Sequence, residues 1–122
     1  MEEVIMESIL TSIKLMLGIE ADCTDFDMEI IPHINTVLMI LNQVGIGPTD
    51  VFSILSDQET WENFLGENYD IHYAAVKTYV YIKVKLVFDP PTNSAILAAL
   101  QSNADMLEWR LNVQQESLKK EG

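Results

Sequence analysis

The amino-acid sequence predicts an all-α protein, a small helical bundle of about four helices with a long C-terminal helix and one irregular loop. Apolar residues recur at spacings of three and four over several long segments, which is the pattern of amphipathic helices. Glycine and proline stand between these segments, where helices end. The chain has 122 residues, of which 48% are hydrophobic. This length and composition predict a single domain over residues 1–122 with a packed core.

The first predicted helix covers residues 4–17. Its apolar stripe is formed by Met6, Ile9, Ile13 and Met16. Gly18 stands where this helix would end. An acidic connector follows over residues 20–25, in which Thr24 and Asp27 have the spacing of a capping box and predict the start of the next helix.

The second predicted helix ends near Val44, because two glycines and a proline follow within four residues. Pro32 interrupts this helix, so either the regular helix begins near Pro32 or the chain kinks there. The residues that the helix is expected to bury are Ile30, Ile31, Ile34, Val37, Leu38 and Leu41.

Residues 49–57 are expected to form the irregular loop, in which the apolar run from Val51 to Leu55 could pair as a strand. Ser56 and Glu59 have capping-box spacing and predict a short helix, which Gly66 would close. The buried residues of that short helix should be Trp61, Phe64 and Leu65.

Residues 70–88 fit two patterns. A strand-like alternation places apolar side chains at Val80, Ile82, Val84 and Leu86. A helical spacing instead aligns Ile71, Ala75, Thr78, Ile82 and Leu86. The segment is long for one strand and contains no turn residue, so we favour a helix.

A long helix is predicted over residues 93–118, after the clear break of the sequence DPPT at residues 89–92. Its apolar seam alternates by three and four residues, as in a coiled coil. The seam comprises Leu97, Leu100, Ala104, Leu107 and Leu111, and Leu118 extends it.

Acidic residues are concentrated in the first part of the chain. Residues 1–70 hold fourteen acidic residues and one basic residue, whereas residues 71–122 hold five acidic and six basic residues. This distribution indicates two differently used surfaces. The formal net charge is −12, which argues against a grip on nucleic acid or on an anionic membrane, since both need a basic surface. The mean hydropathy of +0.12 is high for a small monomer and favours an oligomer.

The cysteine count and the N-terminus predict a protein that is cytoplasmic as made. Cys23 is the single cysteine, so an intrachain disulfide is excluded and a reducing compartment is expected. The sequence has no apolar run of eighteen residues and begins MEE, which is acidic where a signal peptide is basic. We therefore expect no membrane contact.

No motif for catalysis, cofactor binding or metal binding occurs in the sequence. His33 and His72 lie on different predicted helices, and neither an HExxH nor a CxxC motif accompanies them. The acidic connector lacks the glycine and the spaced ligands of a calcium loop, and its acids are Asp22, Asp25, Asp27 and Glu29. We expect these acids to form a solvated face, and we expect no enzymatic activity, no cofactor and no metal.

Two groups of residues are candidates for a subunit interface. In the first, aromatic and basic side chains interleave at Tyr79, Tyr81, Lys83 and Lys85. Such interleaving can stack on single-stranded nucleic acid, but the net charge of −12 favours a helix face or a subunit contact. The second group is Trp109 with Arg110, because both residue types are enriched at interface hot spots. The alternative for Trp109 is that it caps the core.

Three stretches of the sequence, taken in order, resemble those of a known protein family. The first has IKLMLGI at residues 13–19, an Asp-rich connector and HIN at residues 33–35. The second has TW, FLG and VKTYV between residues 60 and 80, and the third has FDPP at residues 88–91 and LEWRLN at residues 107–112. Together they cover nearly the whole chain, which resembles the phage head-tail connector family, small head-completion adaptors of tailed phages and prophages.

The resemblance implies a structural subunit without enzymatic activity that assembles with itself into a ring, usually a dodecamer, beneath the portal protein. The ring belongs to the virion neck, extends the DNA channel and presents a surface to the next neck or tail-completion protein. The two candidate groups above would then contact the portal or a neighbouring subunit. Acidic channel walls would repel phosphate, so DNA would pass without specific binding. On this hypothesis the connector acids Asp22, Asp25, Asp27 and Glu29 face the channel.

The alternative function is that of an acidic DNA mimic, which inhibits a DNA-binding protein by occupying its site. A mimic would present spaced carboxylates on one continuous exposed face, and it would need no ring.

Overall fold

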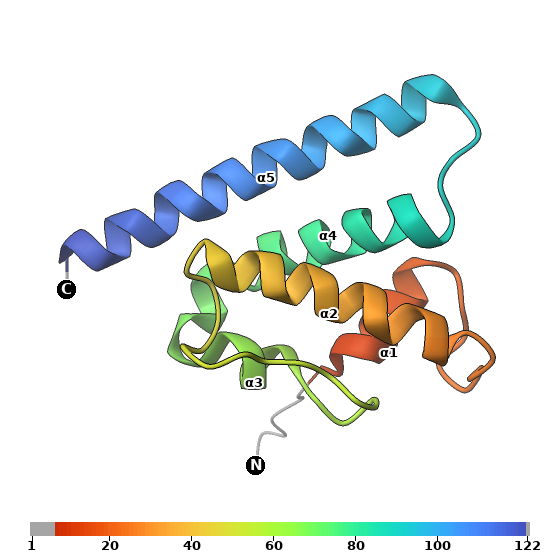
Figure 1. Cartoon of the computed structure of the whole chain (residues 1–122), viewed down its shortest axis with the longest axis horizontal. Coiled ribbons are helices and arrows are strands. Elements are labelled where there is room, and N and C mark those ends of the chain that lie inside the picture. Colours follow the sequence, from red (N-terminus) through yellow and green to blue (C-terminus); the bar gives the residue numbers. More distant parts are fainter. Residues whose placement is uncertain (1–6, 122) are drawn as a thin grey trace, which may run out of the picture.

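The computed structural model describes residues 7–121, and side chains over residues 7–118 (Figure 1). Its helices are α1 (Ile9–Met16), α2 (Asp27–Gln43), α3 (Trp61–Leu65), α4 (Tyr69–Phe88) and α5 (Ser94–Glu121), with a 3₁₀ turn over Gly66–Asn68. Within residues 7–121 no strand forms, and one isolated bridge joins Ser8 to Thr60. Four helices have eight residues or more and α3 has five, so the predicted all-α bundle is confirmed.

Helix α4 is the central helix of the bundle, because it contacts every other helix. Helix α5 runs along one side of the bundle, whereas α1 and α3 lie on the opposite side (Figure 1). Two side-chain hydrogen bonds fix the antiparallel register of α4 and α5. His72 Nε2 lies 3.1 Å from Gln115 Oε1, and the Tyr79 hydroxyl donates to the Glu108 carboxylate.

The central position of α4 explains why residues 70–88 fit two patterns. The helix prediction is confirmed, since α4 covers residues 69–88. Other helices cover α4 on several sides, so it buries residues around much of its circumference. Val80, Ile82 and Val84 are all buried, although they alternate with partly exposed residues. A helix that is covered on more than one face can therefore imitate a strand in its sequence.

The predicted helix ends agree with the structure at several points. Gly18 follows α1 with a φ of 86°, a left-handed conformation that glycine adopts without strain. The break over residues 89–92 separates α4 from α5, and the predicted seam of α5 packs on the core through Ala104 and Leu111. The first three residues of the predicted first helix, with Met6 among them, lie outside the described residues.

Two capping predictions were wrong. Thr24 makes no cap, because α2 begins at Asp27 after Phe26 and has no side-chain cap. The short helix α3 is capped not by Ser56 and Glu59 but four residues later. There the Thr60 hydroxyl accepts from Asn63 N at 3.1 Å, and the Asn63 amide accepts from Thr60 N at 3.0 Å. A capping box needs only a short polar pair, so the same spacing occurs by chance in polar loops.

Pro32 lies inside α2, which starts five residues before it. A proline inside a helix removes the backbone hydrogen bond to the residue four positions earlier. Of the two possibilities that the sequence left open, a start near Pro32 is therefore wrong, since a regular turn precedes it.

The loop between α2 and α3 forms no strand at residues 51–55. Side chains from elsewhere in the chain instead form the hydrogen bonds that fix its backbone. The Asn35 side chain of α2 donates to Ile54 O at 3.0 Å and accepts from Ile54 N at 2.7 Å. Ile54 is fully buried. The Glu59 carboxylate accepts from Leu55 N at 2.8 Å and from Ser56 N at 3.2 Å. The loop therefore has a fixed shape without a pairing strand.

Candidate functional site

Helix α5 carries an exposed apolar stripe on a part of its surface that does not face the core. The stripe comprises Met106, Trp109 and Val113, which follow at spacings of three and four residues and are 46, 65 and 40% exposed. Single exposed apolar residues are common on proteins, but an aligned set that includes a tryptophan is typical of an interaction surface. Because Ala104 and Leu111 already attach α5 to the core, the stripe is not needed for packing within the chain.

Next to the stripe, a hollow of about 470 Å³ opens between α4 and α5, and we call it the α4–α5 groove. Its apolar lining comprises Ala75, Leu107, Trp109, Leu111 and Val113. Arg110 and Gln114 supply its polar groups, and Arg110 is exposed. Within the described residues Arg110 forms no ion pair, so its charge is free to meet an acidic group of another molecule.

The second exposed apolar element is the loop between α2 and α3. Val51 is 84% exposed and Leu55 is 82% exposed. Asp50 and Asp57 flank them and are also exposed. The loop thus presents two aliphatic side chains between two carboxylates.

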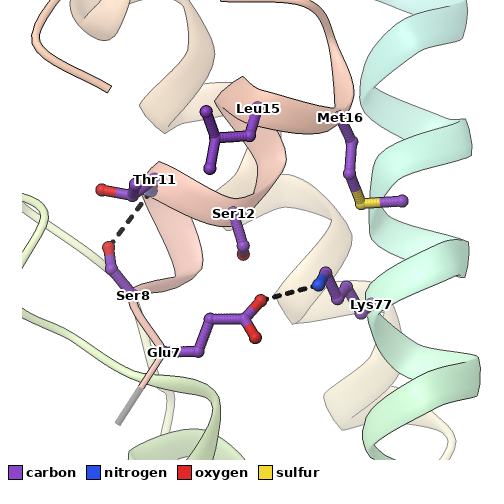
Figure 2. Close-up of a pocket in the computed structure, with 7 residues that line it drawn as sticks. All are labelled: Glu7, Ser8, Thr11, Ser12, Leu15, Met16 and Lys77. Atoms are coloured by element: carbon purple, nitrogen blue, oxygen red, sulfur yellow. Dashed lines mark hydrogen bonds and ion pairs between the residues drawn. The ribbon is translucent and has the colours of Figure 1, made fainter. Parts of the chain in front are cut away.

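A further hollow of about 400 Å³ lies between α1 and α4 (Figure 2). The Lys77 ammonium lies 2.7 Å from the Glu7 carboxylate, and the Tyr73 hydroxyl donates to the same carboxylate. Burial by itself would raise the pKa of Glu7, but the hydrogen bonds from Lys77 and Tyr73 hold it below its ordinary value. Burial would likewise lower the pKa of Lys77, but Glu7 raises it. These groups satisfy one another, so the hollow offers no free acid or base.

The residues of the first predicted interface group do not share one environment. Tyr79 is fully buried, and its hydroxyl is bound to Glu108 between α4 and α5, so it belongs to the core and its place in that group was wrong. Burial and the Glu108 carboxylate raise the pKa of Tyr79. Tyr81, Lys83 and Lys85 are partly exposed on α4.

The second predicted interface group, Trp109 with Arg110, lies on the surface. Trp109 and Arg110 are both exposed and both line the α4–α5 groove. The alternative that Trp109 caps the core is wrong, because two thirds of its surface remains open.

Three of the four connector acids are exposed, namely Asp22, Asp25 and Glu29. Asp27 differs, because it lies 2.9 Å from Lys14, a lysine whose exposure is only 2%. Lys14 also donates to Ala21 O at 3.2 Å and so ties the connector to α1. Asp27 is therefore a structural partner of Lys14 rather than a free carboxylate.

Sequence reasoning missed several residues of these surfaces. Val51 and Leu55 were considered only as strand residues, and Met106 and Val113 were not considered. A sequence signal existed for Met106 and Val113. Their spacing with Trp109 forms a second apolar stripe on the last helix beside the core seam.

Neither histidine has the surroundings of a metal ligand. His72 is buried against Gln115, and within the described residues no group of three or more His, Cys, Asp or Glu side chains is placed to hold a metal ion. In the same part of the chain, no helix combines the length and the apolar character needed to cross a membrane.

Comparison with known protein families identifies a match. A family model described as phage connector protein matches residues 9–118, which is nearly the whole described chain. No curated protein and no solved structure matches the chain significantly. The resemblance drawn from the three sequence stretches is confirmed by the family match.

Proposed function

Since the chain belongs to the phage connector protein family, we propose that it is a single-domain structural subunit of a ring that docks beneath the portal and extends the DNA channel. The observation that carries this proposal is the exposed apolar stripe of α5, Met106, Trp109 and Val113, with the groove beside it. A subunit of 122 residues that leaves this surface uncovered gains stability when another subunit covers it.

The partners follow from the same proposal. The subunit contacts further copies of itself, in a dodecamer, and also the portal protein and the next neck or tail-completion protein. It is made in the host cytoplasm and becomes part of the virion neck. It has no enzymatic role, which fits a surface whose polar groups at Glu7, Tyr73 and Lys77 are already paired.

In the ring, Asp22, Asp25 and Glu29 face or approach the DNA channel. They are exposed and close together in sequence, since Asp22 and Asp25 lie in the connector between α1 and α2 and Glu29 lies in the first turn of α2, at one end of the bundle (Figure 1). Their negative charge repels phosphate and gives DNA no counterion-release gain, so DNA slides without binding. Replacing them with Asn, Asn and Gln should increase the retention of DNA by assembled rings. Equal retention by the variant and the parent ring would contradict this role.

Subunit assembly is tested by solution mass. Light scattering should give a monomer or a ring for the protein alone, and a ring-sized assembly once the portal protein encoded in the same genome is added. The variant Trp109→Ser should fail to assemble. The matched variant Val87→Ser, at a position that is 60% exposed on α4 and outside the groove, should assemble normally. A protein that stays monomeric with and without the portal would refute the proposal.

Part of the acidic charge that the DNA-mimic alternative would need is engaged within the fold. Glu7 is bound to Lys77, Asp27 to Lys14, Glu108 to Tyr79, and Glu59 to backbone amides. Four acids are thus engaged inside the fold, and they are not available for a continuous phosphate-like face.

A further inference from the structure

We propose that the α2–α3 loop of one subunit docks into the α4–α5 groove of the next subunit, with Val51 and Leu55 entering the groove. This inference rests on the proposed ring, and it assigns the contact that closes it. The occupant of the groove is a second copy of this chain, and four observations support that choice.

The first observation is that the loop is built to present these side chains. Ile54 is buried and both of its backbone groups are bound to Asn35. Glu59 holds the next two amides, so the backbone is fixed on both sides of Leu55. A loop that is fixed before binding loses little conformational entropy on docking. Yet Val51 and Leu55 remain 84 and 82% exposed in the part of the chain that the structure describes.

The second observation is that the groove matches the loop in kind and in size. Its lining is apolar, with Ala75, Leu107 and Leu111 among its residues, and Trp109 and Val113 add exposed apolar surface. A volume of about 470 Å³ is enough for two aliphatic side chains.

The third observation is charge complementarity. Asp50 and Asp57 flank the two apolar side chains of the loop and are exposed. Arg110 lines the groove and has no ion pair within the described residues. A loop with two carboxylates and a groove with a free guanidinium attract one another and set the orientation of docking.

The fourth observation is the placement of the two elements on the molecule. The loop begins near α5, where Gly47, Thr49 and Gln115 line one hollow, and its later part runs below the bundle toward α3, on the side away from α5 (Figure 1). Two different surfaces of one subunit make a head-to-tail contact, which repeats from copy to copy and closes into a ring when the rotation permits. A contact between two like surfaces would stop at a dimer.

The test is cross-linking between defined positions in a Cys23→Ser background, with the portal protein present to promote assembly. Protein with Leu55→Cys is mixed with protein with Val113→Cys and treated with a short bismaleimide. We expect a cross-linked pair in the mixture and none with either protein alone. A chain that carries both cysteines should give a ladder of multimers. Far-ultraviolet circular dichroism of each variant checks that it is folded.

The matched control replaces Val113→Cys with Val87→Cys, a position that is more accessible, at 60% against 40% exposed, but lies outside the groove. Leu55→Cys should not cross-link to it. Rings of normal mass that lack the link between positions 55 and 113, or that link position 55 to Val87→Cys or to the portal, would overturn this inference while the ring function stands. Absence of any assembly would overturn both.

A second readout uses side chains without a cross-linker. Leu55→Asp should raise the concentration needed for half-maximal assembly by roughly 10–100-fold, because a buried leucine side chain is lost from each contact. Arg110→Glu should also weaken assembly, and Asp57→Lys in the same chain should restore part of the loss. If Arg110→Glu is harmless, or if Asp57→Lys fails to compensate, the proposed orientation is wrong.

Discussion

Replacing Asn35 with alanine removes the two hydrogen bonds that hold the α2–α3 loop on α2. Asn35 donates to Ile54 O at 3.0 Å and accepts from Ile54 N at 2.7 Å. Ile54 is fully buried, so in the parent fold its backbone N–H and C=O groups depend on these partners. We expect the variant to remain folded but to be clearly less stable, with a loop that has lost its fixed shape.

The magnitude follows from the two backbone groups that are left unpaired. An unsatisfied buried donor or acceptor costs about 1–3 kcal/mol. Alanine has a higher helix propensity than asparagine and returns roughly 0.5 kcal/mol. For two such groups the free energy of unfolding should therefore fall by about 1.5–5.5 kcal/mol, a large part of the roughly 5–15 kcal/mol that holds a typical domain together.

Urea denaturation followed by circular dichroism measures this loss. The matched control is Thr36→Ala, the next residue of α2, whose hydroxyl donates to Pro32 O at 3.0 Å on an exposed surface. That variant should change the unfolding free energy by less than about 0.5 kcal/mol. Equal stability of the two variants would refute the reasoning that the Asn35 amide holds the loop. Under the docking proposal, Asn35→Ala should also weaken ring assembly at temperatures where the protein is folded.

Three further predictions concern stability. Gly47→Ala should cost about 2–4 kcal/mol in urea denaturation, because φ is +95° and a Cβ would lie 2.5 Å from a phenylalanine ring atom. Gly18→Ala, with φ +86° and open space, should cost only about 1–2 kcal/mol, and equal losses would contradict the clash. Lys14→Met should cost about 3 kcal/mol in thermal unfolding, because it leaves Asp27 without its cation, and an unchanged Tm would be contrary evidence. The lowered pKa values of Glu7 and Glu59 give stability that is present above about pH 4.5 and is lost as the pH falls through the folded-state values. If the denaturation midpoint does not decrease when the pH is lowered below about 4.5, the predicted direction of this pH dependence is wrong.

The helices were predictable because their signals are local. The spacing of apolar residues and the glycine and proline breaks located α2, α4 and α5 and the short helix with Trp61. The spacing of apolar residues indicates which face of a helix is buried, whatever element that face packs against. The resemblance to the connector family came from the same local stretches and was confirmed over residues 9–118.

The side-chain pairings were not predictable, because they join residues that are distant in sequence. Nothing near Asn35 in the sequence indicates that its amide pairs with the backbone of residue 54. In the sequence Lys14 stood out only as the one basic residue of residues 1–70, yet the fold buries it against Asp27. Tyr79 was predicted to be an interface residue because aromatic and basic side chains interleave from Tyr79 to Lys85, but a central helix is covered on several sides and this position faces inward.

The sequence by itself therefore determined the helices, the breaks between them and the acidic character of the first seventy residues. Tertiary structure decided which apolar residues of the described chain stay exposed. The spacing indicated the seam of α5 that packs on the core, but only the packing of α5 on α4 shows that Met106, Trp109 and Val113 on the same helix stay exposed. The reason is physical, because a helix buries only the face that a neighbour covers, and the spacing of apolar residues does not show how far around the helix that cover extends.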